Sequence, residues 1–180
     1  PNHLLYTDMF FKAIEHLKSA GDISAENFQF QFFGNEYRYI EKTASQHGIN
    51  DLIIARPRVP YQDVLESVSR SHLMLLRIVK LAISTKLFEG ISLNIPFLAV
   101  IPHGEAEELI REYSPGSYII TEDDTYLDVA AAIKDAMMRY RENQIPANRV
   151  DDFLARFTRE NMTLKLMRIV EERLMKRNSQ

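Results

Sequence analysis

The sequence predicts an α/β fold in which a parallel sheet of about six strands is covered by helices on both faces. Short apolar segments alternate with helical segments about six times along the chain. The apolar segments are continuous runs, which is typical of strands that are buried on both faces. Chains with this order of elements form parallel, Rossmann-like sheets with right-handed connections.

The first half of the chain supplies three predicted strand–helix pairs. Its strands are short apolar runs next to turn residues, and its helices carry apolar residues at helical spacing. Gly21 and Gly48 are expected to end the first two helices, because glycine commonly follows a helix. In order, the predicted elements are the strand Leu4–Thr7, the helix Met9–Ser19, the strand Phe28–Phe33, the helix Asn35–Gln46, the strand Leu52–Ile54 and the helix Tyr61–Ser69.

The second half repeats this alternation. Asn94 and Pro96 stop its first helix, because neither residue favours a helix interior. Ligands of such sheets bind at the carboxyl ends of the strands, so we expect the functional residues in the loops that follow them. The predicted elements are the strand Leu73–Val79, the helix Lys86–Leu93, the strand Phe97–Ile101, the helix Glu105–Glu112, the strand Ser117–Thr121 and the helix Tyr126–Tyr140.

Two closing helices complete the predicted organisation. A Rossmann-like domain is expected over residues 1–145, followed by helices at Val150–Phe157 and Arg159–Lys176. No strand follows these helices, so we expect them to pack outside the sheet or on a partner. The chain opens on Pro1 with a strand-like run directly behind it, and we expect a further domain on its N-terminal side.

The composition suits one domain with a real core and excludes several classes of function. The chain has 180 residues, 46% of them hydrophobic, a net charge of −3 and no cysteine. It therefore lacks thiolate chemistry and a basic surface for nucleic acid. The histidines lack the spacing of metal ligands, so we expect no metal and no cofactor. No apolar run reaches the length of a membrane span and no signal peptide opens the chain, which favours a cytoplasmic location.

The helix predicted at Lys86–Leu93 has the features of an anion site. A cation in its first turn, Lys86, opposes the helix dipole at a cost of a few tenths of a kcal/mol, and a bound anion would reverse that penalty. Backbone N–H groups near Ser84, Thr85 and Lys86 would donate to the anion. Glu89 shares a face with Lys86, so a phosphate and a ribose diol could be held one turn apart. An exposed lysine–glutamate pair explains the same spacing.

Several segments resemble the group 1 glycosyltransferases, which are retaining-type enzymes with the GT-B fold. KLFEGISLNIPFLAV, residues 86–100, resembles the family signature KLFEYLAAGKPVLA. The segments just before and after it are also similar to the family, and so is a glycine-ended strand near the start of the chain. These segments are RVPYQDVLESVSRSHLMLL at 58–76, HGEAEELIRE at 103–112 and FQFQFFGNE at 28–36. The resemblance covers about residues 4–140, in order.

The resemblance implies a donor-binding domain that takes a nucleoside diphosphate sugar, with UDP or GDP as the nucleotide. The sugar would pass to a glycan or lipid-linked acceptor, as in polysaccharide biosynthesis. The acceptor site would belong to the missing N-terminal domain, which could also associate peripherally with the inner face of the membrane. We therefore expect the chain alone to bind nucleotide weakly and to be inactive.

The resemblance also assigns roles to individual residues. Glu89 would hydrogen-bond the ribose hydroxyls, and the loop at Arg58 would flank the base. His103 and Gly104 would contact the sugar or close the cleft. Ser84, Thr85 and Lys86 would lie near the diphosphate.

The chain departs from the family pattern at two positions that matter for the donor. Leu81 stands where many members carry a glutamate that contacts the transferred sugar. Asp8 stands in the first predicted strand–helix loop, where the family usually has glycine, and its charge would repel a diphosphate unless Asp8 caps the next helix. These departures favour "binds a nucleotide" over "selects a sugar".

Other charged residues have a functional and a structural interpretation. Arg77 interrupts an apolar strand, so its guanidinium must reach a partner or a phosphate, and Lys80 is a similar candidate. The glutamates at 105, 107 and 108 compensate a helix dipole. The acidic run at 122–124 is explained by turn and cap chemistry.

Two alternatives to the transferase remain. One is a non-catalytic Rossmann-like docking module with a degraded donor site, which Asp8 and Leu81 favour. The other is a different two-domain α/β enzyme, such as a sugar-nucleotide epimerase, and the spacing of Lys86 and Glu89 does not exclude it.

Overall fold

Helices and strands follow one another in the predicted order, except at the start of the chain. The structure, a computed structural model, describes residues 2–78 and 83–178. Its helices are α1 (Asn2–Ser19), α2 (Tyr37–Gln46), α3 (Tyr61–Ser69), α4 (Thr85–Ser92), α5 (Glu105–Tyr113), α6 (Tyr126–Arg141), α7 (Val150–Phe157) and α8 (Arg159–Asn178), and a 3₁₀ turn spans Asn50–Leu52. Its strands are β1 (Phe30–Phe33), β2 (Ile53–Arg56), β3 (Met74–Arg77), β4 (Phe97–Val100) and β5 (Tyr118–Ile120).

The strand predicted at Leu4–Thr7 is wrong, because these residues lie inside α1. No glycine or proline interrupts the sequence from Asn2 to Ser19, so the helical period can run through it. The part of α1 from Phe10 to Leu17 buries one face in the core. Tertiary packing of that face therefore stabilises the whole segment as a helix.

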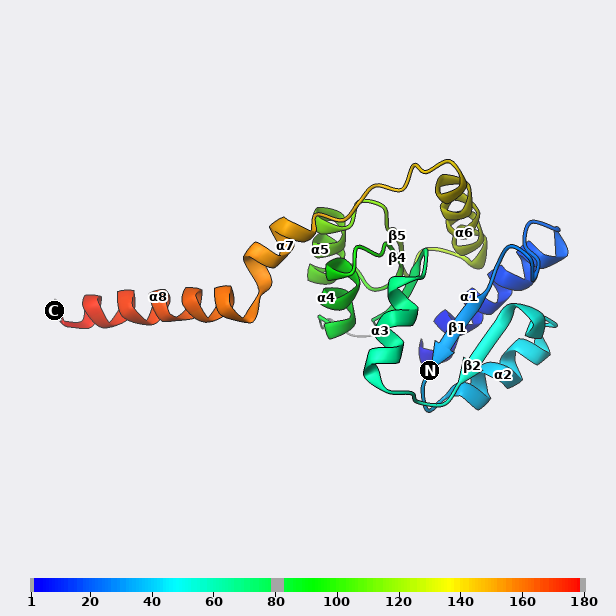
Figure 1. Cartoon of the computed structure of the whole chain (residues 1–180), viewed down its shortest axis with the longest axis horizontal. Helices are drawn as coiled ribbons and strands as arrows, with labels where there is room; N and C mark the ends of the chain where they lie inside the picture. The colour runs from blue at the N-terminus through cyan, green and yellow to red at the C-terminus, as the bar shows by residue number, and fades with distance from the viewer. Residues whose placement is uncertain (1, 79–82, 179–180) are drawn as a thin grey trace.

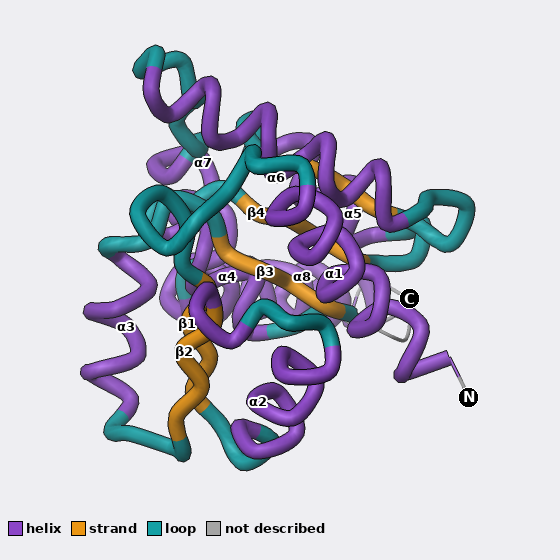
Figure 2. Tube along the Cα trace, turned by 90° about the vertical axis from the view of Figure 1, so that its right-hand side faces the viewer, coloured by secondary structure: helices purple, strands orange, loops and turns teal. Residues whose placement is uncertain are grey.

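The strands form two parallel sheets rather than one six-stranded sheet. β1 pairs with β2, and β4 lies between β3 and β5. The α/β class and the parallel pairing are confirmed, whereas the predicted number of strands is wrong: the described residues contain five. In Figure 2, β1 and β2 form a separate pair below β3 and β4.

Helices cover both faces of the strands, as predicted. One apolar cluster joins α1, α2 and α6 to the strands of both sheets. A second cluster joins α4, α5 and α7 to the opposite face of β3 and β4. β4 is buried along its whole length, because it contributes to both clusters. This burial explains why its sequence is a continuous apolar run.

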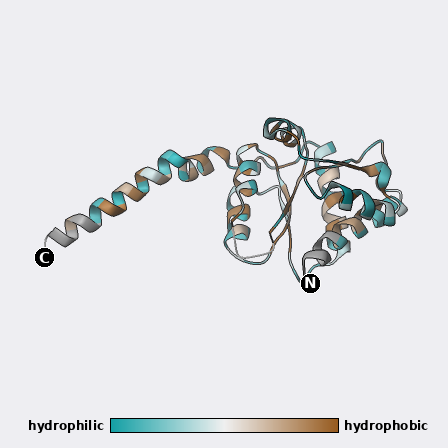
Figure 3. Cartoon of the chain, turned by 90° about the horizontal axis from the view of Figure 1, so that it is seen from below, coloured by the Kyte–Doolittle hydropathy of each residue, from teal (hydrophilic) through white to brown (hydrophobic). Residues whose placement is uncertain are grey.

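The two closing helices behave differently from each other. α7 packs outside the sheet, where the rings of Phe153 and Phe157 contact Phe88 of α4. α8 projects away from the body (Figure 1), and its described side chains are exposed apart from that of Asn161. Apolar and polar residues are mixed along it (Figure 3). α7 therefore packs on the body outside the sheet, whereas the described side chains of α8 do not.

Candidate functional site

The described site residues from Arg77 to Gly104 lie at the carboxyl edge of the second sheet or in the helix that follows it. β3, β4 and β5 are parallel, and Arg77 pairs in register with Val100, which pairs with Ile120. All three strands therefore end at one edge, and α4, α5 and α6 begin beyond it. This is the edge at which ligands of parallel α/β sheets bind.

Ser84 caps the N-terminus of α4 with its own side chain. Its hydroxyl accepts a hydrogen bond of 3.3 Å from the backbone N–H of Lys86. One of the donors expected for an anion is thus already occupied, although by a long bond with which an anion can compete. Thr85 and the Lys86 side chain are exposed, and the ammonium makes no hydrogen bond or ion pair with any described residue.

Glu89 is held by Tyr61 rather than by Lys86. The Tyr61 hydroxyl, on the first residue of α3, donates a 2.8 Å hydrogen bond to Oε1 of Glu89. This carboxylate raises the pKa of Tyr61, mainly through the hydrogen bond. Tyr61 fixes the carboxylate of Glu89 one turn beyond Lys86 and leaves Oε2 for another donor. The alternative of a paired lysine and glutamate does not occur in the structure.

Tyr61 is a site residue that the sequence argument did not single out. It stands three residues after Arg58, in the segment that resembles the glycosyltransferases, so the motif contained it. Its partner lies on another helix, 28 residues away, and no local spacing reveals such a pair. The contact also brings the start of α3, and with it the loop that carries Arg58, next to α4.

The two predicted arginines lie in different settings. Arg58 is exposed in the loop before α3, and its side chain has no hydrogen bond or ion pair with the described residues. Arg77 is exposed at the last position of β3, which resolves how a strand in an apolar core accommodates it. Lys80 and Leu81 lie outside the described residues.

His103 and Gly104 follow β4 at the same edge. Nδ1 of His103 lies 2.8 Å from Oε2 of Glu107, and this hydrogen bond raises the pKa of the imidazole. Glu107 also accepts from Arg111, and its own pKa is lowered. Gly104 directly precedes α5. Its φ of 145° is a backbone conformation that glycine alone adopts readily. His103 is thus an exposed imidazole that Glu107 holds at the end of β4.

Asp124 and Asp8, two of the acidic residues discussed above, bond to partners within the fold. Asp124 accepts from the backbone N–H and the hydroxyl of Thr121 at 2.7 and 2.9 Å, which confirms the predicted turn chemistry. Asp8 lies inside α1 and pairs with Lys12 at 2.6 Å, so the alternative that it caps a helix is wrong. Asp8 is therefore a helix residue and not part of a strand–helix loop.

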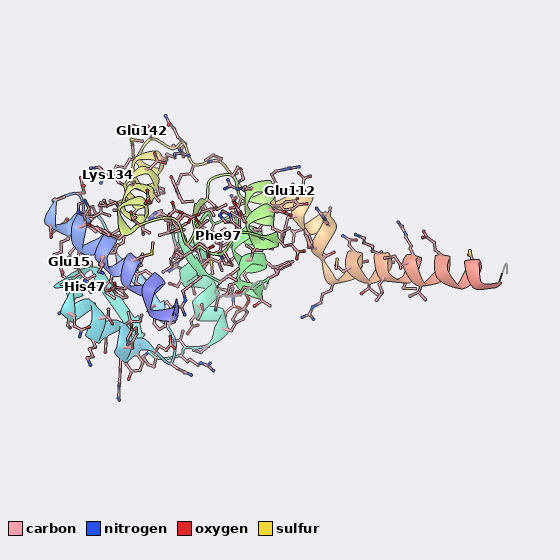
Figure 4. All side chains as sticks on the ribbon, turned by 180° about the vertical axis from the view of Figure 1, so that it is seen from behind. Glu15, His47, Phe97, Glu112, Lys134 and Glu142 are labelled. Atoms are coloured by element: carbon pink, nitrogen blue, oxygen red, sulfur yellow. The ribbon has the colours of Figure 1, made fainter. Side chains whose placement is uncertain are left out.

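A histidine between two helices has a structural role. Nδ1 of His47, which follows α2, lies 2.6 Å from Oε2 of Glu15 in α1, and Figure 4 shows the two side chains together. The ring of His47 stacks on Phe11 with centroids 6.0 Å apart. These contacts hold the end of α2 against α1. They join residues that are far from α4 in the sequence.

The edge offers cations and a carboxylate but no metal cluster. No group of three or more His, Cys, Asp and Glu side chains that could hold a metal ion occurs in the described part of the chain. Within the same residues, no helix is both long and apolar enough to cross a bilayer. Lys86, Arg58 and His103 can attract phosphate, and Glu89 can accept from hydroxyl groups.

Neither protein-family models nor curated proteins contain a match to this sequence.

Proposed function

We propose that this chain is the nucleotide-binding domain of a sugar transferase, with a Rossmann-like arrangement of strands and a nucleoside diphosphate sugar as its donor. The observation that carries the proposal is the helix α4: an exposed Lys86 at its N-terminus and, one turn later, Glu89 oriented by Tyr61. A diphosphate at the N-terminus of α4 meets the helix dipole and the ammonium. Oε2 of Glu89 then accepts from the ribose hydroxyls.

The charges at this edge suit a leaving diphosphate. Transfer of a sugar from such a donor rests on stabilising the developing negative charge, and fixed cations and helix N-termini supply that stabilisation without a metal. Lys86 lies at the N-terminus of α4, and His103 at the next strand end keeps its proton to higher pH because of Glu107. Arg58 lies exposed in the loop before α3, and its planar guanidinium could stack on a base.

Calorimetric titration of the chain with UDP, GDP and ADP tests the proposal. We expect weak binding of at least one diphosphate, and a loss of about tenfold to a hundredfold in Glu89→Gln, because a hydrogen bond to a charged group contributes about 1.5–3 kcal/mol. Lys86→Met should weaken binding and reduce its salt dependence. Glu41→Gln, an exposed carboxylate on α2, is the matched control and should bind as the unchanged chain does.

The second candidate is a docking module without a working donor site. Ser84 and Tyr61 favour it, because they already occupy the Lys86 N–H and one oxygen of Glu89. If none of the three nucleotides binds and Glu89→Ala changes nothing, the docking module replaces the transferase. Transfer of sugar from UDP- or GDP-sugar by this chain alone would contradict the expectation that the acceptor site lies in another domain.

A further inference from the structure

Each sheet has one edge that pairs with no described strand and that we call its inner edge. These are the side of β1 that faces away from β2 and the side of β3 that faces away from β4. The amide of Gly34 donates to Arg56 of β2, so the amides of Gln31 and Phe33, on alternate positions, point to the other side of β1. In β3, the amides of Met74 and Ile78 donate to the β4 side, so that of Leu75 points away from β4. Among the described residues, β1 pairs only with β2 and β3 only with β4.

These inner edges belong to one covered core. Phe30 and Phe32 of β1 and Leu75 of β3 pack against the same buried cluster, which also contains α1 residues. The ring of Phe30 lies 4.8 Å from that of Phe10 in α1. On the opposite face of the sheet, the Ser67 hydroxyl of α3 donates a 2.9 Å hydrogen bond to the side chain of Gln31. A segment between the edges would be enclosed from both faces, so its backbone groups must bond to both edges, as an extended strand does.

The chain topology specifies the direction of that strand. α1 and α2 lie on the same face, and the connection from β1 through α2 leads to β2 on one side of β1. A right-handed connection that enters β1 through α1 must start on the other side of β1. β3, β4 and β5 step the opposite way under α4 and α5, on the other face. A strand from which such a connection starts would therefore lie between β1 and β3, parallel to both.

We propose that β1 and β3 are the inner edges of one sheet, and that an extended apolar segment entering α1 from its N-terminal side pairs in parallel with both. Such a segment satisfies the amides of Gln31, Phe33 and Leu75 and converts the two sheets into one. The sheet then reverses its direction between the new strand and β3, which is a switch point of the kind where α/β sheets bind ligands. The inference rests on strand pairing and holds whether or not the edge binds a nucleotide.

Addition of a strand to the chain tests the proposal. A six-residue apolar extension, Thr-Val-Ile-Val-Thr-Val followed by a Gly-Ser-Gly turn, is joined to Pro1, and amide hydrogen exchange is measured with and without it. We expect exchange at Gln31, Phe33 and Leu75 to slow at least tenfold, with a higher thermal midpoint. The matched control carries proline at alternate positions of the extension, which removes backbone donors and should leave exchange at all three amides as in the unextended chain.

Three results would overturn the proposal. One is unchanged exchange with the apolar extension, because the edges would then not accept a strand. Another is equal slowing in the proline control, which would show non-specific burial rather than pairing. The third is protection of the same amides in the unextended chain that disappears on dilution, because a second copy would then supply the strand.

Discussion

At the scale of single residues, the candidate site depends on contacts between side chains that are distant in sequence. Lys86 was predicted from its place in the first helical turn, and it is exposed at the N-terminus of α4. The orientation of Glu89 comes instead from Tyr61 on another helix. Local spacing therefore identified the chemical groups, whereas the fold determined which of them are paired and which remain available for a ligand.

The ion pair of His103 and Glu107 makes a prediction about titration. Glu107→Gln should lower the pKa of His103, because the hydrogen bond to the carboxylate is the largest cause of its raised value. The imidazolium contributes stability that is complete below its unfolded pKa and is lost as the pH rises through the folded pKa. The lowered pKa of Glu107 sets the acid limit, since its contribution is lost as the pH falls through that value.

NMR titration of the His103 ring checks this prediction. Glu108→Gln is the matched control, because Glu108 is exposed on the same first turn of α5 and makes no contact with the ring among the described residues. An unchanged His103 titration in Glu107→Gln would show that the pair does not form in solution.

At the scale of elements, packing between helices and strands fixes positions that look unremarkable in the sequence. Gly90 stands where the resembled family often has tyrosine, and here the helix α4 approaches β4 closely at that position. Asn148, in the segment before α7, joins α4 through Ile91, the residue that follows α5 (Ser114) and the loop before β4 (Ile95) through its side chain. Both residues position α4, and α4 carries the candidate site.

Gly90→Ala should destabilise the protein by about 1–3 kcal/mol, because over-filling a packed core displaces its neighbours. A Cβ at Gly90 would lie 2.3 Å from Cε1 and 2.4 Å from Cζ of Phe97, a fully buried ring in the interior of the molecule (Figure 4). Urea unfolding measures the change. Ser92→Ala, at an exposed position of the same helix, is the control, and equal stability of the two variants would show that α4 can shift without cost.

Asn148→Ala should cost about 1–3 kcal/mol, because it leaves buried polar groups without their partner. The amide of Asn148 donates to the carbonyl oxygen of Ile95 at 3.2 Å and accepts from the Ser114 hydroxyl at 2.6 Å. Gln144→Ala, an exposed amide in the same connecting segment, should change stability by less than about 0.5 kcal/mol. Similar unfolding midpoints for both variants would mean that water replaces the Asn148 contacts.

At the scale of the whole molecule, a folded body with helices on both faces carries one projecting helix. Both closing helices carry apolar residues, yet the aromatic rings of α7 are packed and the described apolar side chains of α8 are exposed. The inner edges of β1 and β3 are also unoccupied by any described strand. Stability of the body should therefore depend on α7 and not on α8.

Removal of most of α8, in a chain that ends at Thr163, should leave the thermal midpoint unchanged, because the removed side chains that the structure describes are exposed. Phe153→Ala should instead cost about 3–5 kcal/mol, since its fully buried ring packs on α4 and α5. Differential scanning calorimetry on the two variants separates these effects. A lower midpoint in the shortened chain would mean that α8 packs on the body in solution.

The sequence by itself determined the α/β class, the order of elements after residue 20 and the limits of several helices. α3 and α7 have their predicted bounds, because these helices begin and end at local signals that surround an apolar stripe. The same local reasoning failed at Leu4–Thr7, since a short apolar run fits a strand or a helix until packing decides between them.

Only the tertiary structure decided how the strands pair and which site groups meet. The separation into two sheets, the bond from Tyr61 to Glu89 and the links of Asn148 all join segments far apart in the chain. Such contacts depend on the direction and register of packed elements, which no pattern along a single segment contains. The sequence therefore specified the chemical groups of the α4 edge, and the fold specified their partners.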